Sequence, residues 1–220
     1  MERPFDEELK SLKQKLLEMA AHVQESISLS IQGLKERKRE LAEEVLREED
    51  ITNAYDIAVD EICMRLLALR QPVATDLRFL ASAMKIGAEL ERIGDQAVNI
   101  AERTLRLLLF PQLKPLLDLP LMASIAQNMV KDAIKAFIDR DETLAKDVCR
   151  RDDDVDQLND QVFRELLTYT IQDPATIPRA VDLVLIGRHL ERIADHATNI
   201  CEDVIYLIRG KTIKHHYDEG

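Results

Sequence analysis

The sequence predicts an all-α protein built from two tandem, homologous three-helix bundles, with six long helices in all. Apolar residues recur every three to four positions along most of the 220 residues, which is the period of one buried helix face. Six glycines, seven prolines and 4% aromatic residues offer little material for a turn-rich sheet. The stretch LERIGDQAVNIAE at 90–102 returns as LERIADHATNICE at 190–202, with nine of thirteen positions identical.

Three helices are expected in the first half of the chain. The first covers about residues 9–34 and is followed by the polar connection GLKERKRE. The second covers 41–69 and ends before Pro72, because proline removes a backbone donor and disfavours helix at the residue before it. The third follows and runs to about residue 110. Its apolar stripe consists of Ile86, Leu90, Ile93, Ala97 and Ile100.

The same order returns after a proline-rich segment. The expected helices cover residues 121–138, 143–171 and 179–209. Asp141 is placed to cap the start of the middle helix, the segment around Pro174 ends it, and Gly210 ends the last one. The chain therefore divides into a first repeat, 1–112, and a second repeat, 113–220. At an offset of one hundred the copies align Asp56 with Asp156 and Asp60 with Asp160.

Composition and charge exclude several classes of protein. The net charge is −11 and no basic segment stands out, so no nucleic-acid partner is expected. The most apolar segment, 105–122, is interrupted by prolines and is too broken to span a bilayer, so contact with a membrane is expected only through partners. Three scattered cysteines indicate reduced core thiols and a cytoplasmic protein.

Acidic residues four apart form a ladder on one side of the third and sixth helices, since positions i and i+4 of a helix lie nearly above one another. The second and fifth helices carry acidic stripes of their own, and folding each helix pair back on itself brings stripe and ladder together. Hard oxygen ligands of this kind suit magnesium, calcium, manganese or iron. The candidate metal ligands are Asn53, Asp56, Asp60, Glu91, Asp95 and Asn99 in the first copy, and Asp153, Asp156, Asp160, Glu191, Asp195 and Asn199 in the second.

Three interpretations of these acidic residues compete. The first is a metal-binding adaptor that works by protein–protein contact, and the second is a metal-dependent hydrolase. In the third, the ladders are solvated surface of a structural helical module. The sequence holds no phosphate-binding glycine loop, nucleophile elbow or Ser/His/Asp arrangement, which favours a protein that is not an enzyme.

Several stretches together resemble the PhoU family of bacterial phosphate-transport regulators. They are the two LERI motifs with their surroundings, ALRQPVATDLR at the first break, and LAEEVLREED and LAKDVCRRDDDVD at the starts of the second and fifth helices. The resemblance covers about residues 5–215, and LIGRHLERIADHATNICEDVIYLIRG is its most specific part.

The resemblance implies a cytoplasmic, often dimeric helical protein that represses the phosphate-starvation response and phosphate uptake. Its implied partners are a sensor histidine kinase and the ATPase subunit of the Pst phosphate transporter. It also implies bound metal, foremost iron, with magnesium or manganese as alternatives, at motifs that match Glu91/Asp95 and Glu191/Asp195 here. Asn53 is a weaker ligand than a carboxylate, so the second site is expected to bind metal better than the first.

Overall fold

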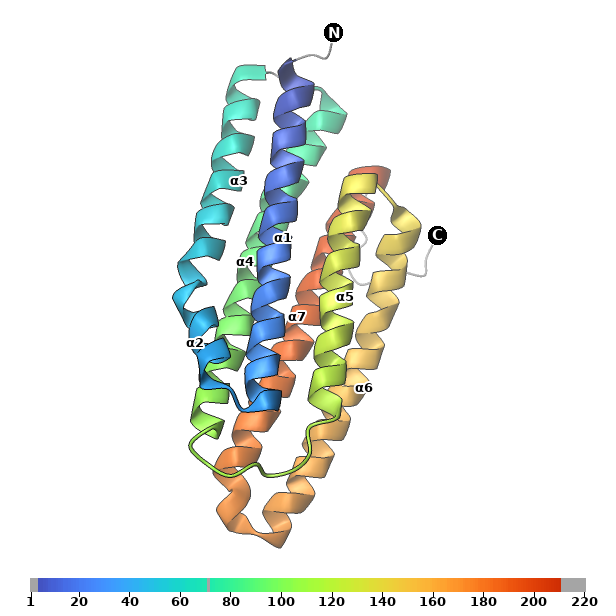
Figure 1. Ribbon diagram of the computed structural model, residues 1–220. Coiled ribbons are helices and arrows are strands. Elements are labelled where there is room, and N and C mark those ends of the chain that lie inside the picture. Colours follow the sequence, from blue (N-terminus) through green and yellow to red (C-terminus); the bar gives the residue numbers. More distant parts are fainter. Residues whose placement is uncertain (1–3, 71, 211–220) are drawn as a thin grey trace.

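The computed structural model describes residues 4–70 and 72–210, and all regular elements in that part of the chain are helices. They lie side by side in an elongated bundle (Figure 1). The first repeat contains α1 (Pro4–Glu36), α2 (Arg39–Arg47), α3 (Glu49–Arg70) and α4 (Ala74–Leu107). The second contains α5 (Asp118–Asp139), α6 (Glu142–Gln172), a short 3₁₀ turn (Pro174–Thr176) and α7 (Ile177–Arg209). The predicted fold class is therefore confirmed.

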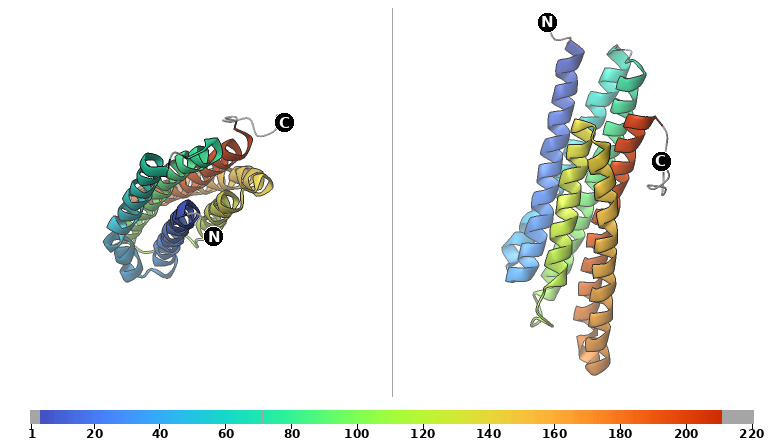
Figure 2. Two further views of the ribbon diagram at one scale, coloured as in Figure 1. Left: turned by 90° about the horizontal axis from the view of Figure 1, so that it is seen from above. Right: turned by 90° about the vertical axis from the view of Figure 1, so that its right-hand side faces the viewer.

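The helices form two layers. One layer runs α3, α4, α7, α6, and the other consists of α1 and α5, which pack against it (Figure 2). The central pair, α4 and α7, runs antiparallel, so the α3–α4 turn and the α6–α7 turn lie at opposite ends of the molecule (Figure 1). The two repeats are thus related by an approximate two-fold axis that crosses the middle of the bundle.

The second predicted helix is interrupted, which corrects the expectation of one helix over 41–69. Helix α2 ends at Arg47, and the backbone N–H of Glu48 is shared between the carbonyl oxygens of Glu44 and Val45, at 3.2 and 3.3 Å. Neither proline nor glycine lies at this point, so no local signal announces the break. Two predicted boundary residues are confirmed: Asp141 accepts a hydrogen bond from the N–H of Leu144, and Gly210 ends α7 at φ 68°.

One continuous cluster of buried apolar side chains runs through both repeats. The predicted stripe of α4 is fully buried, and Phe79 of α4 stacks on Phe137 of α5 with ring centroids 4.8 Å apart. Cys63, Cys149 and Cys201 are free and buried, as expected of core thiols. No helix within 4–70 or 72–210 has an apolar stretch of the length that a membrane crossing needs.

Two arginines end helices in the left-handed conformation, at equivalent places in the two repeats. Arg37 follows α1 at φ 56°, and Arg140 follows α5 at φ 54°. In both cases the next residue's N–H returns to the helix, from Lys38 to Gly33 and from Asp141 to Ala136. This position normally favours glycine, because a Cβ is strained there.

The two arginines should respond differently to glycine. Arg140→Gly is expected to raise the free energy of unfolding by about 0.5–1 kcal/mol, because it relieves the left-handed strain. Arg37→Gly is expected to give no gain, because it also removes hydrogen bonds to the carbonyl oxygens of Leu108 and Phe110. Urea unfolding followed by circular dichroism checks this, and equal shifts in the two variants would contradict it.

Candidate functional site

The first acidic seam lies between α3 and α4. Burial raises the pKa of Glu91, and the neighbouring charges of Asp95 and Asp56 raise it further. Burial also raises the pKa of Asp56, with a smaller contribution from Asp60. The Oδ1 atom of Asp56 is buried and has no hydrogen-bond partner. The folding of α3 onto α4 has therefore gathered negative charge, which the nearby Arg92 and His196 offset only in part.

Two glycines on α4 allow this close approach. A Cβ placed on Gly87 would lie 2.9 Å from Oδ1 of Asp56, and one on Gly94 would lie 2.9 Å from Cγ2 of Thr52. Both distances are shorter than ordinary contacts between heavy atoms. The glycine of LERIGD is thus a packing residue that sets the spacing of α3 and α4 beside the seam.

The second seam, between α6 and α7, carries more negative charge. Burial raises the pKa of Asp152 to about 7, and the charges of Asp195, Asp156, Asp153 and Glu191 add to the shift. One carboxylate oxygen of Asp152 is buried without a partner, which repeats the situation of Asp56. Asp152 is not among the ligands predicted from the sequence, although the charges of this seam converge on it.

The charge of Arg188 only partly offsets the acidity of the second seam. Burial raises the pKa of Asp156, as do Asp195, Asp153 and Asp160, whereas Arg188 lowers it. Arg188 also forms an ion pair with Glu191, three residues further along α7. Burial nevertheless keeps the pKa of Glu191 above its ordinary value. The seam remains net negative.

The repeats match at two different offsets, which corrects the predicted pairing of Asp56 with Asp156. Gly87 faces Asp56 and Val59, whereas Gly187 faces Asn159 and Val162. Helices α4 and α7 therefore match at an offset of 100, but α3 and α6 match at 103. On this register Glu49 and Asn53 correspond to Asp152 and Asp156. The first seam thus has an amide where the second has a carboxylate.

The predicted ligands divide into three groups. Asp56, Glu91 and Asp95 meet in the first seam, and Asp156, Glu191 and Asp195 meet in the second. The charges of Asp60, Asp153 and Asp160 raise the pKa of neighbouring seam carboxylates, and Asn53 lies on α3 at the position that matches Asp156. Two amides are engaged elsewhere: Asn99 donates to the carbonyl oxygen of Asp95, and Asn199 donates to Glu89 of α4.

The carboxylates of the two seams suit a hard cation. Each contains several carboxylates with raised pKa values and one buried oxygen that lacks a donor, and a cation would satisfy both. Within the described residues, the side chains do not converge into a preformed set of three or more His, Cys, Asp or Glu ligands. The arrangement is an open acidic surface between two helices and not a closed cage.

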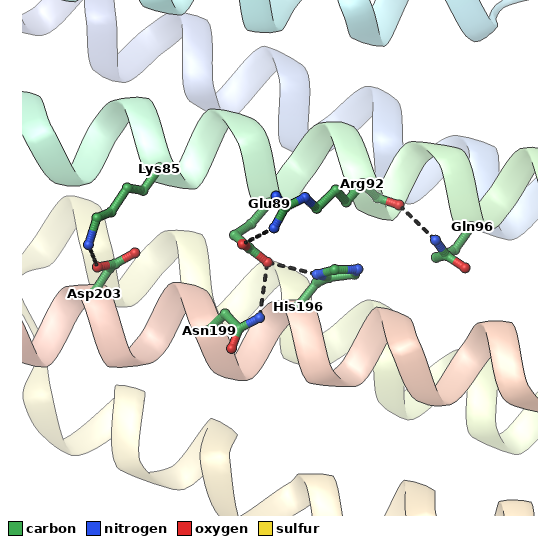
Figure 3. Close-up of polar contacts among 7 residues, drawn as sticks. All are labelled: Lys85, Glu89, Arg92, Gln96, His196, Asn199 and Asp203. Carbon is green, nitrogen blue, oxygen red and sulfur yellow. Dashed lines mark hydrogen bonds and ion pairs between the residues drawn. The ribbon is translucent and has the colours of Figure 1, made fainter. Parts of the chain in front are cut away.

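A separate polar network joins the repeats where α4 faces α7 (Figure 3). The carboxylate of Glu89 contacts Nδ1 of His196 at 2.7 Å and accepts hydrogen bonds from Asn199 at 3.1 Å and Arg92 at 2.9 Å. Burial raises the pKa of Glu89, but the bonds from His196 and Asn199 outweigh burial and hold the pKa below its ordinary value. Lys85 and Asp203 form a further ion pair at 2.7 Å.

The approximate two-fold axis repeats this crossover with different residues. Nδ1 of His189 lies 2.9 Å from Oε1 of Gln96. At an offset of 100, His189 corresponds to Glu89 and Gln96 corresponds to His196. The histidine of this second contact therefore lies at the position that matches Glu89. Burial lowers the pKa of His189 to about 4, with the charges of Arg103 and Arg192 adding to the effect. His189 is therefore neutral near pH 7. No local motif predicted these partners, because they lie about a hundred positions apart in the sequence.

These features define a class of protein: a duplicated three-helix bundle with an acidic seam in each copy. Comparison with known proteins gives the family. The model of the PhoU domain matches twice, at residues 16–104 and 119–204. The chain therefore belongs to the PhoU family.

Relatives and solved structures agree over nearly the whole chain. The phosphate-specific transport system accessory protein PhoU homolog of Aquifex aeolicus is 43% identical over 210 residues, which cover 96% of this chain and 95% of that protein. The PhoU protein of Escherichia coli is 33% identical over 211 residues, covering 96% and 88%. The crystal structure of PhoU from Pseudomonas aeruginosa superposes with a TM-score of 0.90 at 38% identity, covering 94% of this chain and all of that one.

Proposed function

We propose that this chain is a regulatory accessory protein of the phosphate-specific transport system, which represses phosphate uptake and the phosphate-starvation response when phosphate is plentiful. The observation that carries the proposal is the match to phosphate-specific transport system accessory proteins over most of the length of both aligned chains. The fold supports it as well, since the structure offers long helical faces for contact with other proteins.

The proposed mode of action is that of an adaptor. In this view the protein works in the cytoplasm as a homodimer and contacts the ATPase subunit of the transporter and a sensor histidine kinase. The approximate two-fold axis supports this role, because it gives one chain two related but unequal faces. The differences between the repeats, such as Asn53 against Asp156, allow the two faces to prefer different partners.

Metal binding at the acidic seams is the second element of the proposal. Asp152, Asp156, Glu191 and Asp195 would hold a cation between α6 and α7, and Asp56, Glu91 and Asp95 would do so between α3 and α4. Iron is our first candidate, followed by manganese and magnesium. A bound cation would supply the positive charge that each seam lacks, and these carboxylates would thereby tie neighbouring helices together.

The metal proposal predicts the result of removing two carboxylates of the second seam. Glu191→Gln with Asp195→Asn is expected to lower metal affinity about tenfold or more, because both side chains face the proposed ion. The helices should persist, since neither residue belongs to the apolar core. Elemental analysis after dialysis against each metal, with circular dichroism as the check on folding, measures both.

Two exposed carboxylates outside the seams supply the control. Asp139→Asn with Asp154→Asn removes the same charge outside the seams and should leave metal content unchanged. Equal loss of metal in both double variants would show that the ions bind non-specifically to an acidic protein.

The regulatory proposal is tested in cells. Deletion of the gene is expected to release the phosphate-starvation genes in high phosphate, and affinity capture of the chain should recover the transporter ATPase and the kinase. Genes that stay fully repressed after deletion would refute the regulatory role, whatever the metal content of the protein.

A further inference from the structure

A cavity of about 220 Å³ lies where the C-terminal end of α5 meets α1 and α4. Its lining residues are Leu9, Lys10, Lys13, Phe79 and Arg140. Leu9 and Phe79 make its wall apolar, whereas three cations surround it. None of the seam residues lines it, so this part of the molecule is separate from the proposed metal sites.

Two of the cations gather around one aromatic ring. Nζ of Lys13 lies 5.5 Å from the centroid of the Phe79 ring, and Cζ of Arg140 lies 6.0 Å from it. Phe137 also stacks on this ring, so Phe79 contacts a second ring as well as the two cations. Within the described residues, neither cation has a carboxylate within 4 Å; Lys13 donates only to the carbonyl oxygen of Ile138, at 3.5 Å. Two cations thus lie beside one aromatic ring on a chain of net charge −11.

The equivalent place in the molecule surrounds Arg37. Arg37, the counterpart of Arg140, donates to the carbonyl oxygens of Leu108 and Phe110, and Arg179 donates to that of Pro111. The chain itself therefore occupies the space, and the cavity that remains there is about 20 Å³, room for about one water. In the second repeat the guanidinium of Arg140 makes no hydrogen bond to any described residue, and the cavity stays open.

We propose that the open cavity binds a small organic phosphate, with its dianion between Lys13 and Arg140 and its apolar part against Leu9. Two neighbouring cations that have no carboxylate of a described residue within 4 Å favour a doubly charged group, and arginine recognises phosphate oxygens by charge-assisted hydrogen bonds. The cavity has space for an organic group beside the phosphate, and burying the exposed part of Leu9 adds affinity. This inference goes beyond the proposed function and does not depend on it.

The test uses three ligands that separate charge from apolar contact. Phenyl phosphate carries both features, phenol carries only the ring, and inorganic phosphate carries only the charge. Titration calorimetry is expected to show saturable 1:1 binding of phenyl phosphate, at least about tenfold tighter than either of the others. Inorganic phosphate binding as tightly as phenyl phosphate would overturn the assignment to an organic ligand, and no saturable binding of any of them would overturn the site.

Variants locate the binding. Arg140→Gly and Lys13→Met are each expected to weaken phenyl phosphate binding about tenfold, because each removes one charge from the pair. Lys135→Gln removes an exposed cation of α5 outside the cavity and should change affinity less than about twofold. Glycine is favoured at the left-handed backbone of position 140, so Arg140→Gly is not expected to destabilise the fold. A loss of binding with a thermal midpoint at least as high as the parent's therefore cannot result from unfolding. Equal weakening in Lys135→Gln would show that phosphate responds to overall charge and would refute the cavity.

Discussion

Replacing Asp152 by asparagine is expected to raise the free energy of unfolding at pH 7 by about 2 kcal/mol in metal-free buffer. The pKa of Asp152 is raised to about 7 in the folded protein, whereas an aspartate in an unfolded chain titrates near 3.9. A shift of this size in a fully buried group would correspond to about 4 kcal/mol, and screening by water at this partly exposed position reduces it by about half.

The sign of the pH dependence follows from the direction of the shift. A raised pKa means that the folded state holds a proton which the unfolded state has already lost. The contribution to stability is therefore fully present below pH 4 and is lost as the pH rises towards 7. Asp152→Asn should match the parent protein at pH 4 and exceed it at pH 7. Urea unfolding across this range measures the difference.

Asp154→Asn serves as the control for this experiment, because Asp154 is an exposed neighbour on the same helix. Its unfolding curve should follow that of the parent protein at every pH. A profile for Asp152→Asn that stays parallel to the parent's would contradict the view that burial of Asp152, together with charge repulsion in the second seam, opposes folding at neutral pH.

Replacing Phe79 by alanine is expected to lower the free energy of unfolding by about 3–5 kcal/mol. Phe79 is 1% exposed and stacks on Phe137, so its loss opens a cavity and removes an aromatic contact between the repeats. Because one core runs through both repeats, unfolding should remain a single transition at a lower denaturant concentration. Denaturant unfolding followed by circular dichroism measures both.

Phe163→Ala is the matched control, since the side chain of Phe163 is 52% exposed. Its loss should change stability by no more than about 0.5 kcal/mol. Two separate transitions in Phe79→Ala would contradict a shared core and would make each repeat an independent folding unit.

Much of the fold could be predicted from the sequence because helix periodicity is a local property. The stripe Leu90, Ile93, Ala97 and Ile100 is fully buried, and the cap at Asp141 and the stop at Gly210 are where local chemistry places them. The break at Glu48 could not be found in this way. No breaking residue marks it, and the packing of α2 and α3 against α1 and α4 is a tertiary effect.

The candidate site was predicted in outline but not in register. The gathering of Glu91 and Asp95 with Asp56 follows from folding two helices about a turn. The second copy has three fewer residues between corresponding positions: Val162 to Gly187 spans 25, whereas Val59 to Gly87 spans 28. The nearly identical motifs lie on α4 and α7, which match at an offset of 100, so a comparison of the motifs does not reveal the shortening. That is why the sequence favoured Asp153 over Asp152.

The antiparallel arrangement of α4 and α7 also affects the backbone charge at the two ends of the bundle. Helices α4 and α7 have 34 and 33 residues, and their backbone dipoles point in opposite directions. The charges at their ends therefore offset one another by cancellation, whereas Glu89 lies in the middle of α4, beyond the reach of either end, and is held by His196, Asn199 and Arg92. The same cancellation makes the two ends of the bundle alike in backbone charge. A partner that distinguishes one end from the other must therefore recognise side chains.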